Sequence, residues 1–232
     1  MTTGDPRADN SPTVLIIGAG PGIGAAVATA FARAGHPLVL VGRDAGRLAR
    51  TAEAIRSLGP TAGVTTLVAD AADPVAMLSA LRVLRTPSPL GVLVYNAAGW
   101  GGPLLDTDLD DVRRASEVNL HTLVAVVRDL VPSLTSANGS VLITGGGLAL
   151  YPSAPLGVLS VGKAMTRAAA LVLAQELEAS GIAVATVTIA GTVEPGGPFA
   201  PARIAEVYLG LHRRELSGPE IVFSGGAERG EA

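Results

Sequence analysis

The stretch Thr13-Val-Leu-Ile-Ile-Gly-Ala-Gly-Pro-Gly-Ile-Gly24 joins a short apolar run to a glycine-rich turn. The run 13–17 predicts a buried strand, because it stops at glycine and shows no polar alternation. Helical periodicity follows over residues 22–34 and ends at Gly35, a residue type that commonly terminates helices. Glycines between a strand and a helix let the backbone approach a pyrophosphate, and the helix N-terminus supplies N–H groups to bind it.

The alternation of strand and helix continues along the rest of the chain. Further apolar runs predict strands at 38–41, 64–69, 91–95, 140–144, 182–189 and 220–223. Helical periodicity predicts helices at 44–58, 74–85, 109–134 (bent near Pro132), 157–179 and 201–215. Short strands that are apolar on both faces are typical of a parallel sheet covered by helices on both sides. We therefore expect an α/β fold with a single Rossmann-type doubly wound parallel sheet, in one domain over 12–226 between disordered tails at 1–11 and 227–232.

The composition excludes several kinds of site. The 232 residues are 48% hydrophobic and 16% charged, enough apolar material for a sizeable core. A net charge of −3 gives no reason to expect nucleic acid or an acidic membrane as a partner. The chain has no cysteine, which excludes disulfides, thiolate nucleophiles and cysteine-held metals. Its three histidines are far apart in sequence, so we expect no metal site.

We expect neither a signal peptide nor a membrane-spanning segment. Residues 1–11 are polar and lack the apolar core of a signal peptide. No uninterrupted apolar run is long enough to span a bilayer. We expect a cytoplasmic protein with no membrane as a partner.

The glycine spacing at 18–24, Gly-x-x-x-Gly-Ile-Gly, resembles that of the short-chain dehydrogenase/reductase family. Further features match that family in order: Asp70 after the third strand, Asn96-Ala-Ala-Gly99 after the fourth, Val118-Asn119 in the long helix and Lys163 in the next. The resemblance covers roughly residues 13–223. It is specific because unrelated motifs agree in both order and spacing.

The resemblance implies a set of cofactor contacts. It assigns the pyrophosphate and ribose to Gly18, Gly20, Gly22, Ile23 and Gly24. It assigns the adenine to Asp70 and Ala71, and the adenosine pocket to Asn96 and Ala97. The alternatives are a turn without a ligand, an Asp70 that only caps a turn and an Asn96 that only supplies turn geometry.

The end of the second strand favours NADP(H) over NAD(H). An acidic residue there would accept hydrogen bonds from the ribose 2′-hydroxyl and repel a 2′-phosphate. This chain has Gly42 followed by Arg43, whose side chain can grip a phosphate in a bidentate way. The alternative is that Arg43 is only a solvated residue at a helix start. Asp44 is a candidate N-cap of that helix.

The catalytic residues of the family are only partly matched. In the family, a serine and a tyrosine polarise the substrate carbonyl, and a lysine four residues after the tyrosine favours the phenolate. Lys163, the only lysine in the chain, and Asn119 match the family, but Leu159 occupies the tyrosine position and Gly146 the serine position. Leucine and glycine cannot transfer a proton, and the loss of one good acid–base group typically costs two to four decades in rate.

Two functions remain open at this point. The first is an atypical NADP(H)-dependent oxidoreductase that reduces a carbonyl or related group of a small molecule. Its proton would come from Tyr151, Ser153 or Ser160, from water, or from the substrate. The second is a nucleotide-binding protein without redox chemistry, either a repurposed cyclase, dehydratase or isomerase or a non-catalytic partner.

The last part of the chain adds two expectations. By the resemblance, Thr192 and Val193 follow the sixth strand and contact the nicotinamide carboxamide. The short segment 194–198 leaves little material for a lid, so the pocket is open or completed by a partner chain. The helices at 109–134 and 157–179 resemble those that form the family's interfaces, which implies a homodimer or homotetramer; the alternative is ordinary burial on the sheet.

Overall fold

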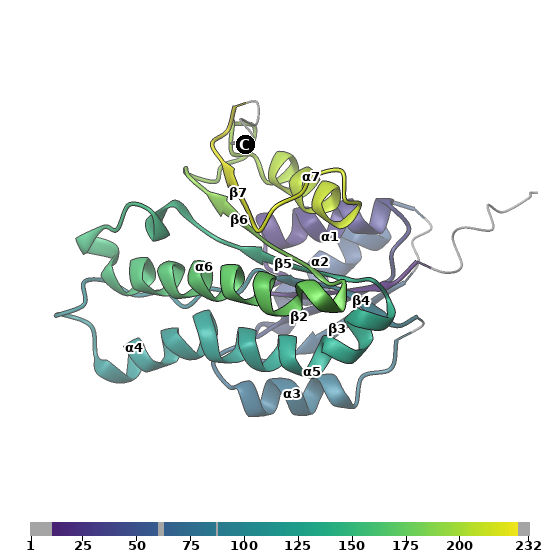
Figure 1. The fold of residues 1–232 in the computed structure, drawn as a ribbon, viewed down its shortest axis with the longest axis horizontal. Coiled ribbons are helices and arrows are strands. Elements are labelled where there is room, and N and C mark those ends of the chain that lie inside the picture. Colours follow the sequence, from purple (N-terminus) through teal and green to yellow (C-terminus); the bar gives the residue numbers. More distant parts are fainter. Residues whose placement is uncertain (1–10, 60–62, 87, 227–232) are drawn as a thin grey trace, which may run out of the picture.

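A computed structural model of the chain describes residues 11–59, 63–86 and 88–226. Within these residues, seven parallel strands form one sheet with the order β3-β2-β1-β4-β5-β6-β7 (Figure 1). The strands are β1 (Thr13–Ile17), β2 (Leu38–Gly42), β3 (Val64–Val68), β4 (Leu90–Tyr95), β5 (Ser140–Thr144), β6 (Ala183–Ile189) and β7 (Glu220–Phe223). The predicted α/β fold is confirmed. Apart from Ser11, the predicted tails lie outside the described residues.

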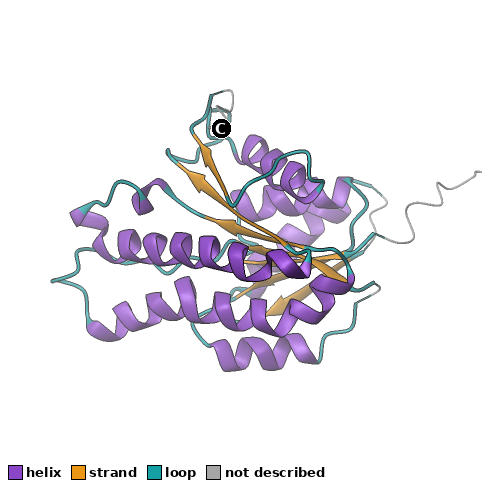
Figure 2. Cartoon of the chain, viewed as in Figure 1, coloured by secondary structure: helices purple, strands orange, loops and turns teal. Residues whose placement is uncertain are grey.

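Helices cover both faces of the sheet, so that the strands form a central layer (Figure 2). One apolar core lies under α1 (Ile23–Arg33), α2 (Ala45–Arg56) and α7 (Pro201–His212). The other lies under α3 (Pro74–Arg82), α5 (Thr122–Ser136) and α6 (Gly157–Leu177), and α4 (Leu109–Ser116) precedes α5. Successive strand residues alternate between the two cores: Val14 and Ile16 enter the first, Leu15 and Ile17 the second.

The strand order reverses at β1. The chain first moves outward from β1 to β2 and β3, and then returns so that β4 pairs with the other side of β1. The loops that follow β1 and β4 therefore separate toward opposite faces and leave a crevice at the carboxyl ends of the strands, where open α/β sheets bind ligands.

The long helix predicted at 109–134 is interrupted, and the position of the interruption corrects the sequence analysis. A π-helical turn at Glu117–His121 separates α4 from α5, with the N–H of Thr122 donating to the carbonyl of Glu117. The predicted bend site, Pro132, instead lies inside α5, which runs on to Ser136. The π-turn has a tertiary cause, because the hydroxyl of Tyr95 donates to the carbonyl of Val118.

The third strand is less buried than expected. β3 is an edge strand, and Thr65, Thr66 and Val68 are exposed. Its polar threonines suit an edge that only one neighbour covers. The expectation that every strand is apolar on both faces is therefore wrong for β3.

One helical segment, 154–180, is long and apolar enough to span a membrane by length and composition. Core helices of globular folds pass the same test, and α6, which forms most of this segment, packs against β6 (Figure 1). The cytoplasmic location stays a prediction.

Two histidines pack together near the amino ends of the strands. The rings of His36 and His212 lie 5.2 Å apart, and both contact Phe31. Nδ1 of His36 is 3.0 Å from the carbonyl of Pro12, and Nδ1 of His212 is 3.2 Å from the hydroxyl of Ser140. Burial lowers the pKa of both rings, that of His212 to about 4, and the nearby arginines 213 and 214 add to the effect on His212.

We predict that this pair makes the fold less stable in acid. Because the folded-state pKa values lie below those of the unfolded chain, unfolding takes up protons as the pH falls. Stability from this source is complete above the unfolded value of about 6.5 and is lost toward pH 4, by on the order of 1–2 kcal/mol after allowance for partial exposure. Urea unfolding between pH 7 and pH 4 measures the loss. His212→Gln should flatten the profile.

Candidate functional site

Two glycines of the loop between β1 and α1 are required by packing. Gly18 has a φ of +88°, which favours glycine, and a Cβ atom there would lie 2.6 Å from the backbone nitrogen of Ala97. A Cβ atom on Gly24 would collide with the carbonyl of Gly18. These close approaches bring the loop, the start of α1 and the end of β4 together. Packing alone therefore accounts for glycine at positions 18 and 24, and no ligand is needed to explain them.

The other two glycines leave open space. Neither Gly20 nor Gly22 has an atom within 4 Å of where a Cβ atom would stand. Gly22 is the N-cap of α1, and this helix has no side-chain cap and no acidic residue in its first turn. The N–H groups of Ala25 and Ala26 donate to the carbonyls of Gly20 and Gly22, which leaves those of Ile23 and Gly24 available to an anion placed over the loop, such as a pyrophosphate.

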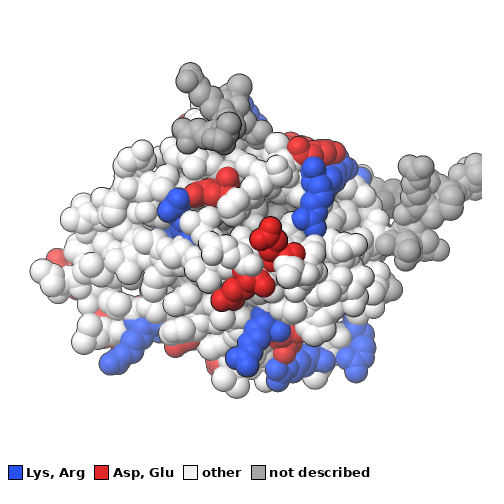
Figure 3. Space-filling model, in the orientation of Figure 1, with Lys and Arg blue, Asp and Glu red and all other residues white. Residues whose placement is uncertain are grey.

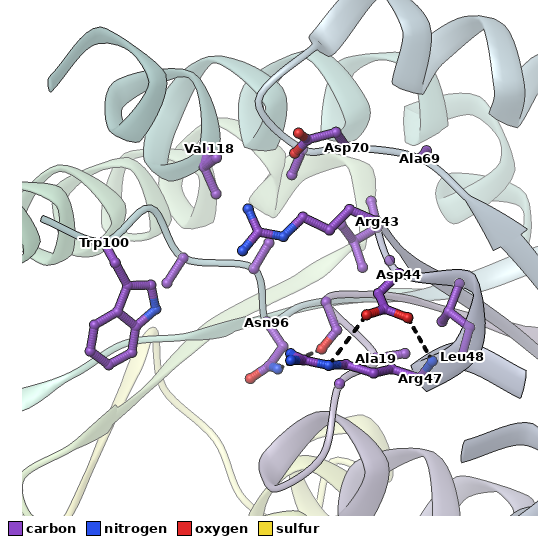
Figure 4. A pocket seen from close by; sticks show the side chains of 17 residues that line it. Ala19, Arg43, Asp44, Arg47, Leu48, Ala69, Asp70, Asn96, Trp100 and Val118 are labelled. Atoms are coloured by element: carbon purple, nitrogen blue, oxygen red, sulfur yellow. Dashed lines mark hydrogen bonds and ion pairs between the residues drawn. The ribbon is translucent and has the colours of Figure 1, made fainter. Parts of the chain in front are cut away.

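A cavity of about 420 Å³ opens beside this loop, at the carboxyl ends of β1 to β4 (Figure 4). Its size suits a small-molecule or cofactor site. Seven predicted site residues line it: Gly18, Gly20, Arg43, Asp70, Ala71, Asn96 and Ala97. The other predicted residues are not part of its lining: Gly22, Ile23, Gly24, Asn119, Tyr151, Lys163, Thr192 and Val193.

Two arginines reach the cavity from the end of β2. The guanidinium of Arg43 extends into the cavity, with Asp70 on one side and Asn96 on the other (Figure 4). None of the ion pairs in the described part of the chain includes Arg43. Arg47, which the sequence analysis missed, lines the same cavity one turn further on. The pair provides positive charge where a phosphate could bind.

Asp44 is the N-cap of α2, as the sequence suggested. It accepts the N–H of Arg47 at 2.9 Å, and its second oxygen lies 3.4 Å from Nε of the same residue. The bond from the Arg47 N–H lowers the pKa of the Asp44 carboxyl. The carboxylate is thus held by the helix start, although it also forms part of the cavity wall.

Asp70 caps a turn and also lines the cavity, while its predicted contact with adenine stays a prediction. One carboxylate oxygen accepts the N–H of Ala72 at 3.0 Å, which caps the turn after β3. The other lies 3.5 Å from the guanidinium of Arg114 on α4. The same side chain lines the cavity, where Trp100 and Val118 form a further part of the wall.

Asn96 connects the cavity to the rest of the sheet edge. Its Nδ2 donates to the carbonyl of Gly18 at 2.8 Å, and its Oδ1 accepts the hydroxyl of Thr144 at 2.8 Å. Because Thr144 uses its proton in that bond, the buried hydroxyl of Tyr208 acts as the donor to Thr144, at 2.7 Å. Sequence reasoning found Asn96 but missed Thr144 and Tyr208, which carry no motif.

Lys163 lies at the end of the same network. Its Nζ donates to the carbonyl of Thr144 at 3.0 Å. The side chain is partly buried, and burial lowers the pKa of Lys163 to about 8. Three consecutive hydrogen-bonded residues, Asn96, Thr144 and Lys163, therefore join the glycine loop to the only lysine.

Leu159 and Gly146, which the sequence analysis assigned to the family's tyrosine and serine positions, are placed differently relative to this lysine. Leu159 lies one turn earlier on α6 and is buried. Gly146 is next to the lysine stem: a Cβ atom there would lie 3.4 Å from both Cδ and Cε of Lys163, an ordinary contact distance. Gly146 has extended backbone, so neither conformation nor space requires glycine at this position.

Asn119 is fully buried in the π-turn. Its side chain exchanges two hydrogen bonds with the backbone of Gly99, accepting at 3.2 Å and donating at 3.3 Å. Its own carbonyl accepts the hydroxyl of Thr166 on α6 at 2.8 Å. Asn119 thus ties the loop after β4 to α6, and its predicted part in a water chain to Lys163 stays a prediction.

The remaining predicted residues lie in exposed loops or are occupied by local bonds. Tyr151 is 75% exposed, and Thr192 and Val193 are exposed after β6. Ser160 accepts the N–H of Ser153 at 3.0 Å and donates to its carbonyl at 3.4 Å. Their catalytic and nicotinamide-binding roles stay predictions.

The family described as short chain dehydrogenase matches residues 12–196, and this chain belongs to it. Sulfoacetaldehyde reductase 2 of Chromohalobacter salexigens is 32% identical over 182 residues, which are 76% of this chain and 71% of that protein. Among further curated relatives, the matched part covers 49–66% of their own lengths.

Solved structures of the family have the same fold. A short-chain dehydrogenase from Sphingobium yanoikuyae in complex with NADPH superposes with a TM-score of 0.76 and 28% identity, over 88% of this chain and 86% of that chain. L-Sorbose reductase from Gluconobacter frateurii, complexed with NADPH and L-sorbose, reaches a TM-score of 0.82 at 21% identity, over 91% and 94%. At that lower identity the likeness concerns the fold alone.

The different surroundings of the loop glycines yield a prediction. Gly18→Ala should lower the free energy of unfolding by about 1–3 kcal/mol, because of its positive φ and the close backbone of Ala97. Gly20→Ala should change it by less than about 0.5 kcal/mol, because the added methyl enters open space. Denaturant unfolding of both variants measures the difference. Equal losses would contradict the assignment of Gly20 to a ligand space.

Proposed function

We propose that the chain is an atypical NADP(H)-dependent oxidoreductase that reduces a carbonyl or related group of a small molecule. The observation that carries the proposal is the cavity in which Arg43 and Arg47 lie beside an uncapped, glycine-rich helix start. Such a helix start suits a pyrophosphate, and the arginines suit a 2′-phosphate. Family membership and the NADPH in the Sphingobium structure support the same cofactor.

Each part of the cavity wall would have a separate task. The loop N–H groups would hold the pyrophosphate, Arg43 and Arg47 the 2′-phosphate, and Asp70 with Ala71 the adenine. Lys163, Thr192 and Val193 would hold the nicotinamide end. The bound cofactor supplies the hydride, so the protein has to position the substrate and transfer a proton.

The names of the curated relatives include both reductases and dehydrogenases, and we propose reduction as the direction. The curated relative from Chromohalobacter is named a reductase. Leu159 and Gly146 distinguish this chain from the family pattern, because neither side chain can donate a proton. The same two residues favour the alternative, a nucleotide-binding member of the family without redox activity.

Fluorescence titration of the intact chain with NADPH tests the proposal first. We expect saturable binding, followed by consumption of NADPH with at least one member of a panel of aldehydes and ketones. Absence of binding would exclude the oxidoreductase, and binding without turnover on any carbonyl would favour the non-redox alternative.

Arg43→Ala should weaken NADPH by about 10- to 100-fold while changing NADH little, because the guanidinium would contact only the 2′-phosphate. Arg50→Ala is the matched control, since Arg50 is exposed on α2, the helix that follows Arg43, but does not line the cavity. Dissociation constants for both nucleotides, measured at one salt concentration, give the ratio. An equal loss for NADPH and NADH would refute the phosphate role.

We also propose a homodimer or homotetramer formed through α6 and its neighbours. Four positions on one side of α6 are exposed and apolar: Val161, Ala164, Ala168 and Val172. Much of the surface around α4, α5 and α6 is uncharged, with charged side chains in small groups (Figure 3). Alanines at such positions let two helices approach closely.

Light scattering of the intact chain should give a multiple of 23.2 kDa. The double substitution Val161→Glu and Val172→Glu should reduce the mass to that of the monomer, because the carboxylates would be buried in the interface. Val75→Glu, at an exposed valine of α3, is the control and should leave the mass unchanged. A monomeric wild-type chain would contradict the proposal.

A further inference from the structure

Lys163 is an isolated cation with unused hydrogen-bonding capacity. No ion pair in the described part of the chain includes it. Within the same residues, its ammonium has one acceptor, the carbonyl of Thr144 at 3.0 Å. An ammonium has three N–H donors, so two remain for water or a ligand. The residue is partly buried.

The groups around Lys163 neither neutralise it nor compete for its proton. On α6, Leu159 precedes it by one turn, and Arg167 follows by one turn but is paired with Glu220 of β7. At the end of β5, the carbonyl of Thr144 accepts from the ammonium, and Gly146, which has no side chain, lies beside the lysine stem. Burial lowers the pKa of the lysine to about 8. A general acid is most effective when its pKa is close to the pH at which the enzyme works.

Other candidates for a proton donor fit the structure less well. Ser160 is buried, and its hydroxyl exchanges both of its hydrogen bonds with the backbone of Ser153. The side-chain amide of Asn119 is bonded to Gly99 on both sides. Tyr151 is 75% exposed, and its hydroxyl has no hydrogen-bond partner among the described residues to position it.

We propose that Lys163 is itself the acid–base residue of this chain, in place of the missing tyrosine and serine. The inference rests on the proposed carbonyl reduction. The carbonyl carbon accepts a hydride from reduced nicotinamide, which becomes oxidised, and the π electron pair of the carbonyl passes to its oxygen. That oxygen takes a proton from the Lys163 ammonium to form the alcohol. The neutral amine that remains regains a proton from water.

The single lysine allows a direct test on the wild-type chain. Biosynthetic labelling with lysine carrying ¹³C at Cε places one lysine signal in the NMR spectrum, and Lys163→Met identifies it by its loss. We expect that signal to titrate with a midpoint near 8 in the free protein. A midpoint near the ordinary lysine value of about 10.4 would overturn the proposal.

Kinetics separate proton transfer from a positioning role. Carbonyl reduction should decline as the pH rises through the midpoint of the NMR titration, because the ammonium is the donor, and alcohol oxidation should rise over the same interval. Lys163→Arg keeps a cation and N–H donors but cannot release a proton. It should bind NADPH within about three-fold of the wild type but reduce the carbonyl at least about 100-fold more slowly, without the inflection.

The outcomes distinguish this inference from the proposed function. Lys163→Arg that retains both the rate and the inflection would overturn the role of Lys163 while leaving the oxidoreductase intact. A wild-type chain that binds no NADPH, or reduces no carbonyl, would instead remove the proposed function on which the inference rests. Circular dichroism melting of Lys163→Arg checks that it folds, and the wild-type NMR titration decides the pKa if it does not.

Discussion

The hydrogen bonds of Thr144 hold the candidate site together. Its hydroxyl is shared between Asn96 and Tyr208, and its carbonyl accepts the ammonium of Lys163. Asn96 in turn bonds to Gly18 in the glycine loop. The ends of β1, β4 and β5 and the helix α6 are therefore joined through three polar side chains and two carbonyls. Buried polar groups are costly unless they are paired, so the same network that positions the site also fixes the register of its elements.

The topology of the sheet explains why these residues meet. All the strands are parallel, so the residue after each strand falls at the same edge. The reversal of order at β1 places the end of β4 beside the end of β1, and Asn96 therefore reaches Gly18 although 78 positions separate them. The cavity with its two arginines lies at the carboxyl ends of β1, β2 and β3. The strand order therefore determines which residues, distant in sequence, meet at the site.

Residues with a local signal could be predicted from the sequence. The glycine loop, Arg43 and the N-cap Asp44 follow directly from strand ends and helix starts, and the structure places each of them at those positions. The strands and helices are close to their predicted bounds because apolar periodicity continues through each of them.

Features with a long-range cause could not be predicted. The π-turn at 117–121 depends on two distant side chains. The hydroxyl of Tyr95 donates to the carbonyl of Val118, and the hydroxyl of Thr166 donates to the carbonyl of Asn119. Thr144 and Tyr208 resemble any other strand or helix residue until the fold brings them together across 64 positions. In the described part of the chain no ion pair includes Lys163, and this too depends on which residues the fold places around it. A partly buried ammonium without a carboxylate partner lowers stability, because burial favours the neutral amine. A hydrophobic residue of similar length would fill the space beside Gly146 without that cost, so the presence of the ammonium is best explained by a ligand that uses it.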